Sequence, residues 1–113
     1  ALEANKTFLK RANETLAQLS IDTVAIIEGE LAKGYKRQAP YNVILINGAV
    51  PEIPDCLYNQ LCDGGRLVSV VGDGAYGKGT LVTSHNNVVT SREIFDAGTP
   101  TLLGFEKETI FSF

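Results

Sequence analysis

The stretch that decides the fold runs from residue 39 to residue 72 and reads APYNVILINGAVPEIPDCLYNQLCDGGRLVSVVG. Residues 43–46 form an unbroken apolar run that is rich in β-branched side chains. Such a run is typical of a strand that is buried on both faces of a parallel sheet. Residues 67–71 are apolar in the same way and predict a second buried strand.

The residues between these two runs predict a helix. Pro51 and Pro54 set a rigid turn, and Asp55 is a suitable N-cap for a helix that continues through Leu61. The glycine pair 64–65 then ends that helix. A strand, a helix and a strand in this order make a right-handed βαβ unit, so the sequence predicts an α/β fold.

Small residues follow the first predicted strand. Asn47, Gly48 and Ala49 lie at its carboxyl end, where open α/β sheets place their ligands. Gly48 and Ala49 would allow the backbone of a bound molecule to approach closely. The alternative is that small residues are needed there only to turn the chain before Pro51.

The sequence of this segment resembles the C-terminal half of proteins of the protein-L-isoaspartate O-methyltransferase family. Together with its flanks, the resemblance covers residues 1 to about 97. The resemblance rests on five short motifs: APYN at 39–42, GAVPEIP at 48–54, QL at 60–61, GGRLV at 64–68 and VVG at 70–72. The resemblance implies a Rossmann-like, mostly parallel sheet with flanking helices and a C-terminal antiparallel hairpin. It also implies S-adenosylmethionine as cofactor and an isoaspartyl-containing protein or peptide as methyl acceptor.

The resemblance assigns roles to residues near the ends of three strands. Glu3 matches the acidic residue that binds the ribose hydroxyls of S-adenosylmethionine, and a carboxylate can accept both hydrogen bonds of a cis-diol. Gly29 and Glu30 match a Gly-Asp pair that meets the adenine amino group. Residues 47–49 match the loop that faces the methyl donor and the incoming carboxylate. The plain alternatives are a frayed terminal Glu3 and a solvated strand end at Glu30.

Other family features are expected to lie upstream of Ala1, namely the glycine-rich donor-binding loop and a segment with a substrate-contacting Ser. The chain has no methionine, so we expect residues 1–113 to be one partial methyltransferase-like domain. No catalytic side chain is expected, because a carboxylate is already a nucleophile and catalysis is mainly positioning. Without the donor loop, the isolated chain is expected to bind little S-adenosylmethionine and to be nearly inactive.

Two alternatives to the isoaspartyl enzyme follow from the sequence. Residues 99–105 read TPTLLGF, where most family members have a Phe-Val-Pro-Leu-like segment that lines the substrate pocket. A related methyltransferase of altered or lost substrate range is therefore a competitor. The other alternative is a non-catalytic α/β interaction or scaffold domain derived from a methyltransferase core. The genomic sequence immediately upstream of Ala1 would distinguish the enzyme from the scaffold.

The remaining elements are expected from local patterns. Residues 5–19 predict an amphipathic helix with one apolar stripe, and 31–38 a basic loop or short helix. Strands are predicted over 23–27, 80–84, 88–95 and 110–113, a turn over 85–87, and irregular, glycine-rich chain over 72–79.

Two motifs and one histidine look functional but are better explained otherwise. Residues 72–77 fit a G-x-G-x-x-G pattern and, with Lys78, nearly spell a phosphate-binding loop. Both motifs need a helix to follow, and Gly79 stands where the second requires Ser or Thr. His85, the only histidine, lies in a predicted turn without other metal ligands nearby, so no metal site is expected.

Composition bounds the class of protein. A net charge of −3 gives no electrostatic case for binding nucleic acid or an anionic membrane, and no apolar run is long enough to span a bilayer. Cys56 and Cys62 would point to different faces of the predicted helix and could not pair. Reduced thiols favour a cytoplasmic protein.

An exposed sheet edge is also expected. In the parent fold the first strand lies between the second and the fourth, so its absence would leave 23–27 and 43–46 without their usual neighbour. Either these strands pair directly, or a second copy supplies the missing edge, because unpaired strand edges recruit partners. The sequence therefore predicts a homo-oligomer.

Overall fold

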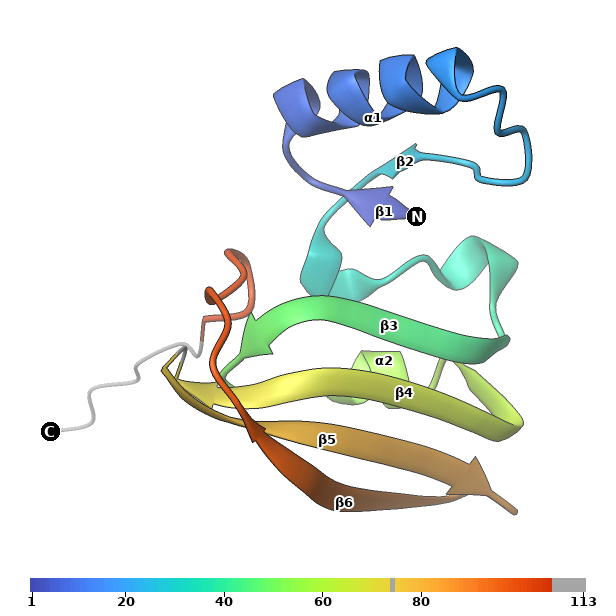
Figure 1. The fold of residues 1–113 in the computed structure, drawn as a ribbon. Coiled ribbons are helices and arrows are strands. Elements are labelled where there is room, and N and C mark those ends of the chain that lie inside the picture. The colour runs from blue at the N-terminus through green and yellow to red at the C-terminus, as the bar shows by residue number, and fades with distance from the viewer. Residues whose placement is uncertain (74, 107–113) are drawn as a thin grey trace, which may run out of the picture.

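The structure is a computed structural model that describes residues 1–73 and 75–106. The order of elements is β1 (Leu2–Glu3), α1 (Lys6–Gln18), β2 (Ile27–Glu28), the 3₁₀ turns η1 (Leu31–Lys33) and η2 (Lys36–Gln38), β3 (Tyr41–Val50), α2 (Asp55–Tyr58), β4 (Leu61–Asp73), β5 (Tyr76–His85) and β6 (Val88–Ala97) (Figure 1). The predicted strand at 110–113 lies outside the described residues.

The strands form two sheets. β1 and β2 pair in parallel, and a separate sheet has the order β3-β4-β5-β6. In the larger sheet β3 and β4 are parallel, with Ile44 opposite Leu67, whereas β5 and β6 continue as antiparallel neighbours. The α/β class, the parallel βαβ unit and the C-terminal antiparallel hairpin are thereby confirmed.

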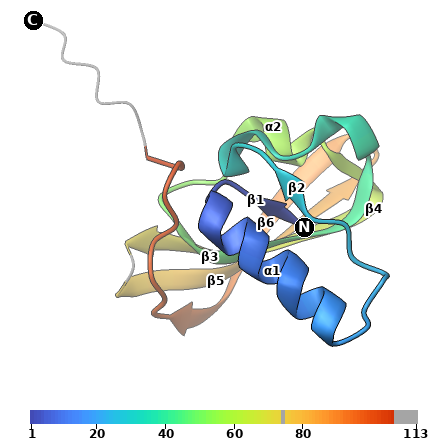
Figure 2. The same cartoon turned by 90° about the horizontal axis from the view of Figure 1, so that it is seen from above.

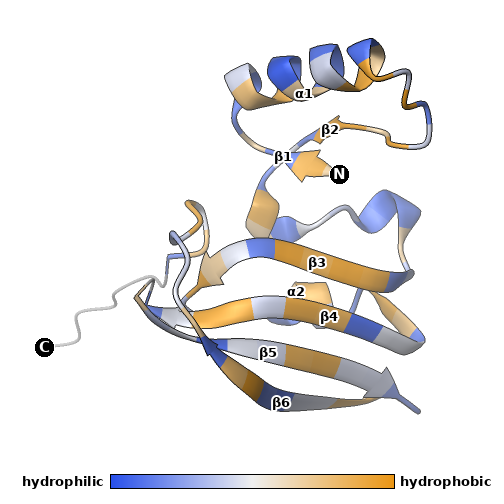
Figure 3. Ribbon diagram, viewed as in Figure 1, coloured by the Kyte–Doolittle hydropathy of each residue, from blue (hydrophilic) through white to orange (hydrophobic). Residues whose placement is uncertain are grey.

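The hydrophobic core lies on one face of the larger sheet, under α2 and the η1–η2 loop. Its buried apolar members are Ile46, Val50, Ile53, Leu57, Leu61, Leu67, Val82 and Phe105. The expectation that residues 43–46 are buried on both faces is wrong. Val43 is 57% exposed and Leu45 is 67% exposed, because their side chains point to the opposite face, which no described element covers. Figure 3 shows apolar stretches along β3 and β4 that are interrupted by hydrophilic positions.

The helix after β3 is shorter than predicted. α2 covers only Asp55–Tyr58, and Pro54 rather than Asp55 is its N-cap. β4 begins already at Leu61, which pairs with Tyr41, so the glycine pair 64–65 lies within a strand. Cys62 is consequently on β4 and not on the helix. Both cysteines are free thiols, as predicted.

The glycine-rich stretch predicted to be irregular, residues 72–79, lies in strands at 72–73 and 76–79. β4 continues to Asp73 and β5 begins at Tyr76, with Gly77 and Gly79 inside β5. Neighbouring side chains fill the space beside these glycines: Val70 contacts the position where Gly77 would carry a Cβ, and the Phe95 ring would lie 2.5 Å from a Cβ on Gly79. A strand, not a helix, follows the nucleotide-like motif, so neither phosphate-binding reading holds.

The final hairpin is confirmed. β5 and β6 are joined by Asn86 and Asn87, whose φ angles are +51° and +64°. Two consecutive residues with positive φ are typical of the type I′ turn, whose twist matches that of the flanking strands. Asparagine adopts the left-handed backbone conformation more readily than most residues. The Asn86 N–H donates to Asp63 Oδ1 at 2.7 Å, which ties the turn to β4.

The N-terminal part forms a small layer beside the larger sheet (Figures 1 and 2). The predicted helix is confirmed as α1, and the Asn5 side chain caps it by accepting from Thr7 N and Phe8 N. Its apolar stripe faces residues 24–26 across a shallow hollow of about 440 Å³. The strand predicted over 23–27 is reduced to Ile27–Glu28, because β1 offers only two residues to pair with.

The sheet edges differ from the expectation in one respect. β2 has a neighbour, which is β1, and it does not pair with β3. Within the described residues the outer strands are therefore β1 and β2 of the small sheet and β3 and β6 of the large one. On the outer side of β3 there is an isolated bridge between Ala49 and Thr101.

Candidate functional site

The structure brings together Glu3, Gly29 and Glu30, the three residues that the resemblance assigns to the methyl donor and that are called the donor-side candidates below. β1 and β2 are parallel, so their carboxyl ends share one edge, where Glu3 ends β1 and Gly29 and Glu30 follow β2. The Gly29 N–H donates to the Glu3 carbonyl oxygen at 3.1 Å. A Cβ on Gly29 would lie 3.0 Å from Leu2 Cδ1, so glycine is favoured there by close packing.

The two carboxylates at this edge are accessible. Glu3 is half-buried, and its Oε2 accepts from Ala4 N at 3.1 Å, which occupies one of about four lone-pair sites of a carboxylate. The Glu30 carboxylate lies 3.3 Å from Lys33 Nζ, with both side chains more than 70% exposed. An exposed ion pair of this kind is weak, so Glu30 can exchange Lys33 for another donor.

Asn47, Gly48 and Ala49, the candidates for the acceptor side, lie within the carboxyl end of β3 and not in a loop after it as predicted, and they differ in access. Asn47 is exposed, whereas Ala49 is fully buried. Ala49 N donates to Pro100 O at 3.1 Å, and Leu102 N donates to Ala49 O at 2.8 Å. A Cβ on Gly48 would lie 2.5 Å from Leu102 Cγ. Of these candidates, Asn47 presents its side chain to solvent.

The segment after β6 packs against Gly48 and Ala49, a contact that local sequence patterns did not reveal. Thr101 bridges to Ala49, Leu102 lies against Gly48, and Phe105 is buried in the core with 6% exposure. The sequence signal for this segment was its place, since residues 99–105 stand where most family members have a segment that lines the substrate pocket. The departure from the family therefore lies directly beside the expected acceptor loop.

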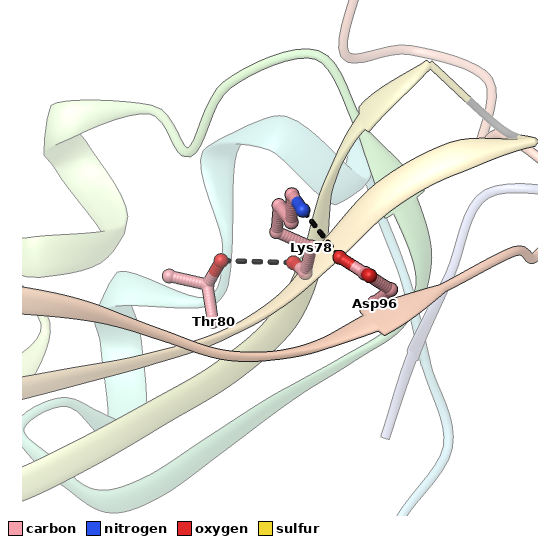
Figure 4. Close-up of polar contacts among 3 residues, drawn as sticks. All are labelled: Lys78, Thr80 and Asp96. Carbon is pink, nitrogen blue, oxygen red and sulfur yellow. Dashed lines mark hydrogen bonds and ion pairs between the residues drawn. The ribbon is translucent and has the colours of Figure 1, made fainter.

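A polar cluster on the outer hairpin has a structural role. Lys78 and Asp96 are opposite each other on β5 and β6 and form an ion pair, and Thr80 Oγ1 donates to the Lys78 carbonyl oxygen at 2.9 Å (Figure 4). Its hydrogen bond to Asp96 and the opposite charge of that carboxylate raise the pKa of Lys78 above 10.5. A lysine held in its charged form is neither a base nor a nucleophile at neutral pH, although it borders a hollow of about 390 Å³.

No metal centre is found in residues 1–73 and 75–106, where His, Cys, Asp and Glu side chains nowhere gather in threes. His85 is exposed at the end of β5, with its Nδ1 3.8 Å from Asp63 Oδ1. None of the helices in these ranges has the length and apolar character needed to cross a bilayer.

Comparison with known proteins decides the family. The model of the protein-L-isoaspartate(D-aspartate) O-methyltransferase family matches residues 1–95. The chain belongs to this family. A methyltransferase of the family from Ectopseudomonas mendocina is 34% identical over 97 residues, which are 86% of this chain and 46% of that protein. One from Methanoculleus marisnigri is 44% identical over 62 residues, covering 55% of this chain and 28% of the relative.

Solved methyltransferases of the family share the fold. A protein-L-isoaspartate O-methyltransferase superposes with a TM-score of 0.81 at 20% identity, covering 91% of this chain and 33% of the other. A putative member from Plasmodium falciparum, solved with S-adenosyl-L-homocysteine, gives 0.75 at 19% identity, covering 89% of this chain and 50% of the other. The chain thus spans about half or less of the length of these relatives. Its family is one of S-adenosylmethionine-dependent methyltransferases, as the resemblance implied.

Proposed function

We propose that residues 1–113 are part of one methyltransferase domain that transfers a methyl group from S-adenosylmethionine to an isoaspartyl carboxylate of a protein or peptide. The observation that carries this proposal is the common direction of β1, β2 and β3, whose carboxyl ends lie on the same side of the molecule (Figure 1). Glu3 and Glu30 come at the ends of the first two strands and Asn47 near the end of the third. Glu3, Glu30 and Asn47 are therefore placed toward the carboxyl ends of strands that share one direction.

Each of these residues has a role that its chemistry supports. The Glu3 carboxylate accepts hydrogen bonds from the two ribose hydroxyls, and the Glu30 carboxylate accepts one from the adenine amino group. Asn47 offers an amide that can orient the incoming carboxylate. S-adenosylmethionine, when bound, supplies a methyl group on a good leaving group. The chain has only to hold both reactants in line, and no side chain has to move a proton.

The packing beside Gly48 favours an altered acceptor as the second candidate. Leu102 belongs to the segment that departs from the family pattern. Its side chain fills the space beside Gly48 through which the backbone of a methyl acceptor would approach. An enzyme with this arrangement would accept a carboxylate that reaches Asn47 without passing over Gly48. A series of isoaspartyl peptides with different neighbours, compared with free carboxylic acids, separates the two candidates.

We also propose that the chain is cytoplasmic and self-associates. The thiols of Cys56 and Cys62 are free, which suits a reducing compartment. β3 is an outer strand whose Val43 and Leu45 side chains are largely exposed, and such edges pair with other strands. Light scattering across a concentration series is expected to show a mass that rises above 12.2 kDa. A constant monomer mass at high concentration would contradict self-association.

Donor binding is tested by calorimetric titration with S-adenosylmethionine. The isolated chain is expected to show no micromolar binding, and such binding would contradict the proposed need for a further donor-binding segment. A chimaera in which residues 1–97 replace the matched part of the Ectopseudomonas mendocina relative is expected to bind. Glu3→Gln should weaken that binding about tenfold, as expected when charged hydrogen bonds are lost. The exposed Glu14→Gln on α1 serves as the matched control.

A further inference from the structure

Gln60 is a buried polar residue with contacts far away in the sequence. It lies between α2 and β4 with 5% exposure. Its Nε2 donates to the Lys33 carbonyl oxygen at 2.8 Å, and its Oε1 accepts from Tyr35 N at 3.1 Å. One side-chain amide therefore serves a donor and an acceptor on the backbone of the loop between β2 and β3. A buried amide of this kind is costly unless both ends are paired, as they are here.

The backbone of Gln60 bonds to the first residue of β3. Its carbonyl oxygen accepts from the N–H of Tyr41, the first residue of β3, at 2.7 Å. The Tyr41 hydroxyl in turn donates to the Tyr35 carbonyl oxygen. Gln60 is thus bonded both to the loop that leaves the small sheet and to the strand that begins the large one.

The loop itself is pressed onto this junction. Gly34 has φ +63°, and a Cβ there would lie 2.5 Å from Gln60 Oε1 and 2.7 Å from Leu57 Cδ2. Cys56 Sγ donates to the Ala32 carbonyl oxygen at 3.0 Å. The carboxyl end of η1 is therefore fixed by groups from the α2 region, and only glycine fits at position 34.

The fixed end of η1 is close in sequence to a donor-side residue. Glu30 is the N-cap of η1, whose last residue, Lys33, accepts the bond from Gln60. We infer that Gln60 is a positioning residue, which fixes the loop that carries Glu30 against the amino end of β3 at Tyr41, for binding of the adenosine group. This assignment depends on the proposed function.

The isolated chain tests the positioning itself by hydrogen exchange. Gln60→Leu should speed exchange of the Tyr35 amide about tenfold or more, the effect of losing a buried hydrogen bond. Gln60→Met keeps the length of the side chain but offers neither the donor to Lys33 nor the oxygen acceptor for Tyr35, so it should speed Tyr35 exchange as well and shift the Glu30 resonances. Gln38→Leu, exposed in η2, is the matched control. Unchanged Tyr35 exchange and unchanged Glu30 resonances would overturn the inference.

The chimaera tests the consequence for the donor. Gln60→Met should raise the KM for S-adenosylmethionine about tenfold while kcat changes less than threefold, since lost positioning affects binding of the adenosine group. If the parent chimaera transfers no methyl group, the proposed function fails. If it is active and Gln60→Met leaves the KM for the donor unchanged, the positioning role fails alone. A fall in kcat by the same factor as the rise in KM would mean general destabilisation and would also contradict the positioning role.

Discussion

Leu102 occupies the space that a side chain on Gly48 would need, because a Cβ built there lies 2.5 Å from Leu102 Cγ and 2.8 Å from its Cδ2. Gly48→Ala is therefore expected to lower the free energy of unfolding by about 1–3 kcal/mol, the usual cost of overpacking. Urea unfolding of the isolated chain measures this loss.

A double-mutant cycle shows whether the loss comes from this contact. Leu102→Ala removes the clash, so Gly48→Ala should cost less in that background, and the cost that remains is that of a side chain at φ +157°. An equal cost in both backgrounds would place the effect in the backbone of β3 and not in the packing of the C-terminal segment.

Substitutions in the β5–β6 turn are expected to change the stability of the chain according to how readily each residue adopts the left-handed backbone conformation. Asn87 has φ +64°, where alanine costs about 1 kcal/mol and glycine costs little. Asn87→Ala should therefore destabilise the chain, whereas Asn87→Gly should be neutral or slightly stabilising, since Asn-Gly is the preferred type I′ pair. Thermal unfolding followed by circular dichroism ranks the three proteins, and Asn87→Ala at least as stable as Asn87→Gly would argue against the turn.

Stability is expected to fall in alkali. The pKa of Lys78 is raised by its hydrogen bond to Asp96 and by the charge of that residue. The pKa of Tyr58 is raised by burial and by nearby Asp55 and Glu52. A group with a raised folded pKa contributes its full stability below its unfolded pKa, here about 10, and loses it as the pH rises through the folded value.

The pH dependence of the unfolding free energy above pH 10 measures this loss, as expected from these groups. Lys78→Met and Asp96→Asn should each make the decline less steep, because either change removes the pair. Tyr58→Phe should reduce it further. The same slope in all variants would show that neither group is responsible.

The two faces of β4 are expected to differ in their tolerance of substitution. Leu67 is fully buried, and Leu67→Ala should cost about 2–5 kcal/mol through lost transfer energy and a cavity. Its neighbour Val68 is 38% exposed on the other face, so Val68→Ala serves as control and should cost less than about 1.5 kcal/mol. Equal losses in chemical denaturation would mean that a second layer covers the exposed face.

Local patterns predicted the elements whose signals are contained in neighbouring residues. The apolar run at 43–46 indicated β3, the periodicity after Asn5 indicated α1, and the asparagine pair indicated the final turn. Features set by distant residues were not visible. Gly79 joins a strand because the Phe95 ring fills its free side, and α2 is short because residue 61 pairs with Tyr41.

The candidate site shows the same division. Resemblance to the family was enough to place Glu3 and Glu30 at one edge, because strand order fixes that edge. The cover that Leu102 forms over Gly48 depends on a segment that departs from the family, and no local pattern indicates it. Gln60 was part of a family motif, yet its contact with the loop at Lys33 and Tyr35 depends on the tertiary fold.

Transfer of a labelled methyl group from S-adenosylmethionine to an isoaspartyl peptide tests the central claim most directly. The chimaera carrying residues 1–97 should label the isoaspartyl peptide and leave the matching aspartyl peptide unlabelled, and the isolated chain should label neither. Glu3→Gln in the chimaera should raise the donor KM and leave the peptide preference unchanged. A folded chimaera that binds the donor but labels no carboxylate, or an isolated chain that labels the peptide by itself, would contradict the account.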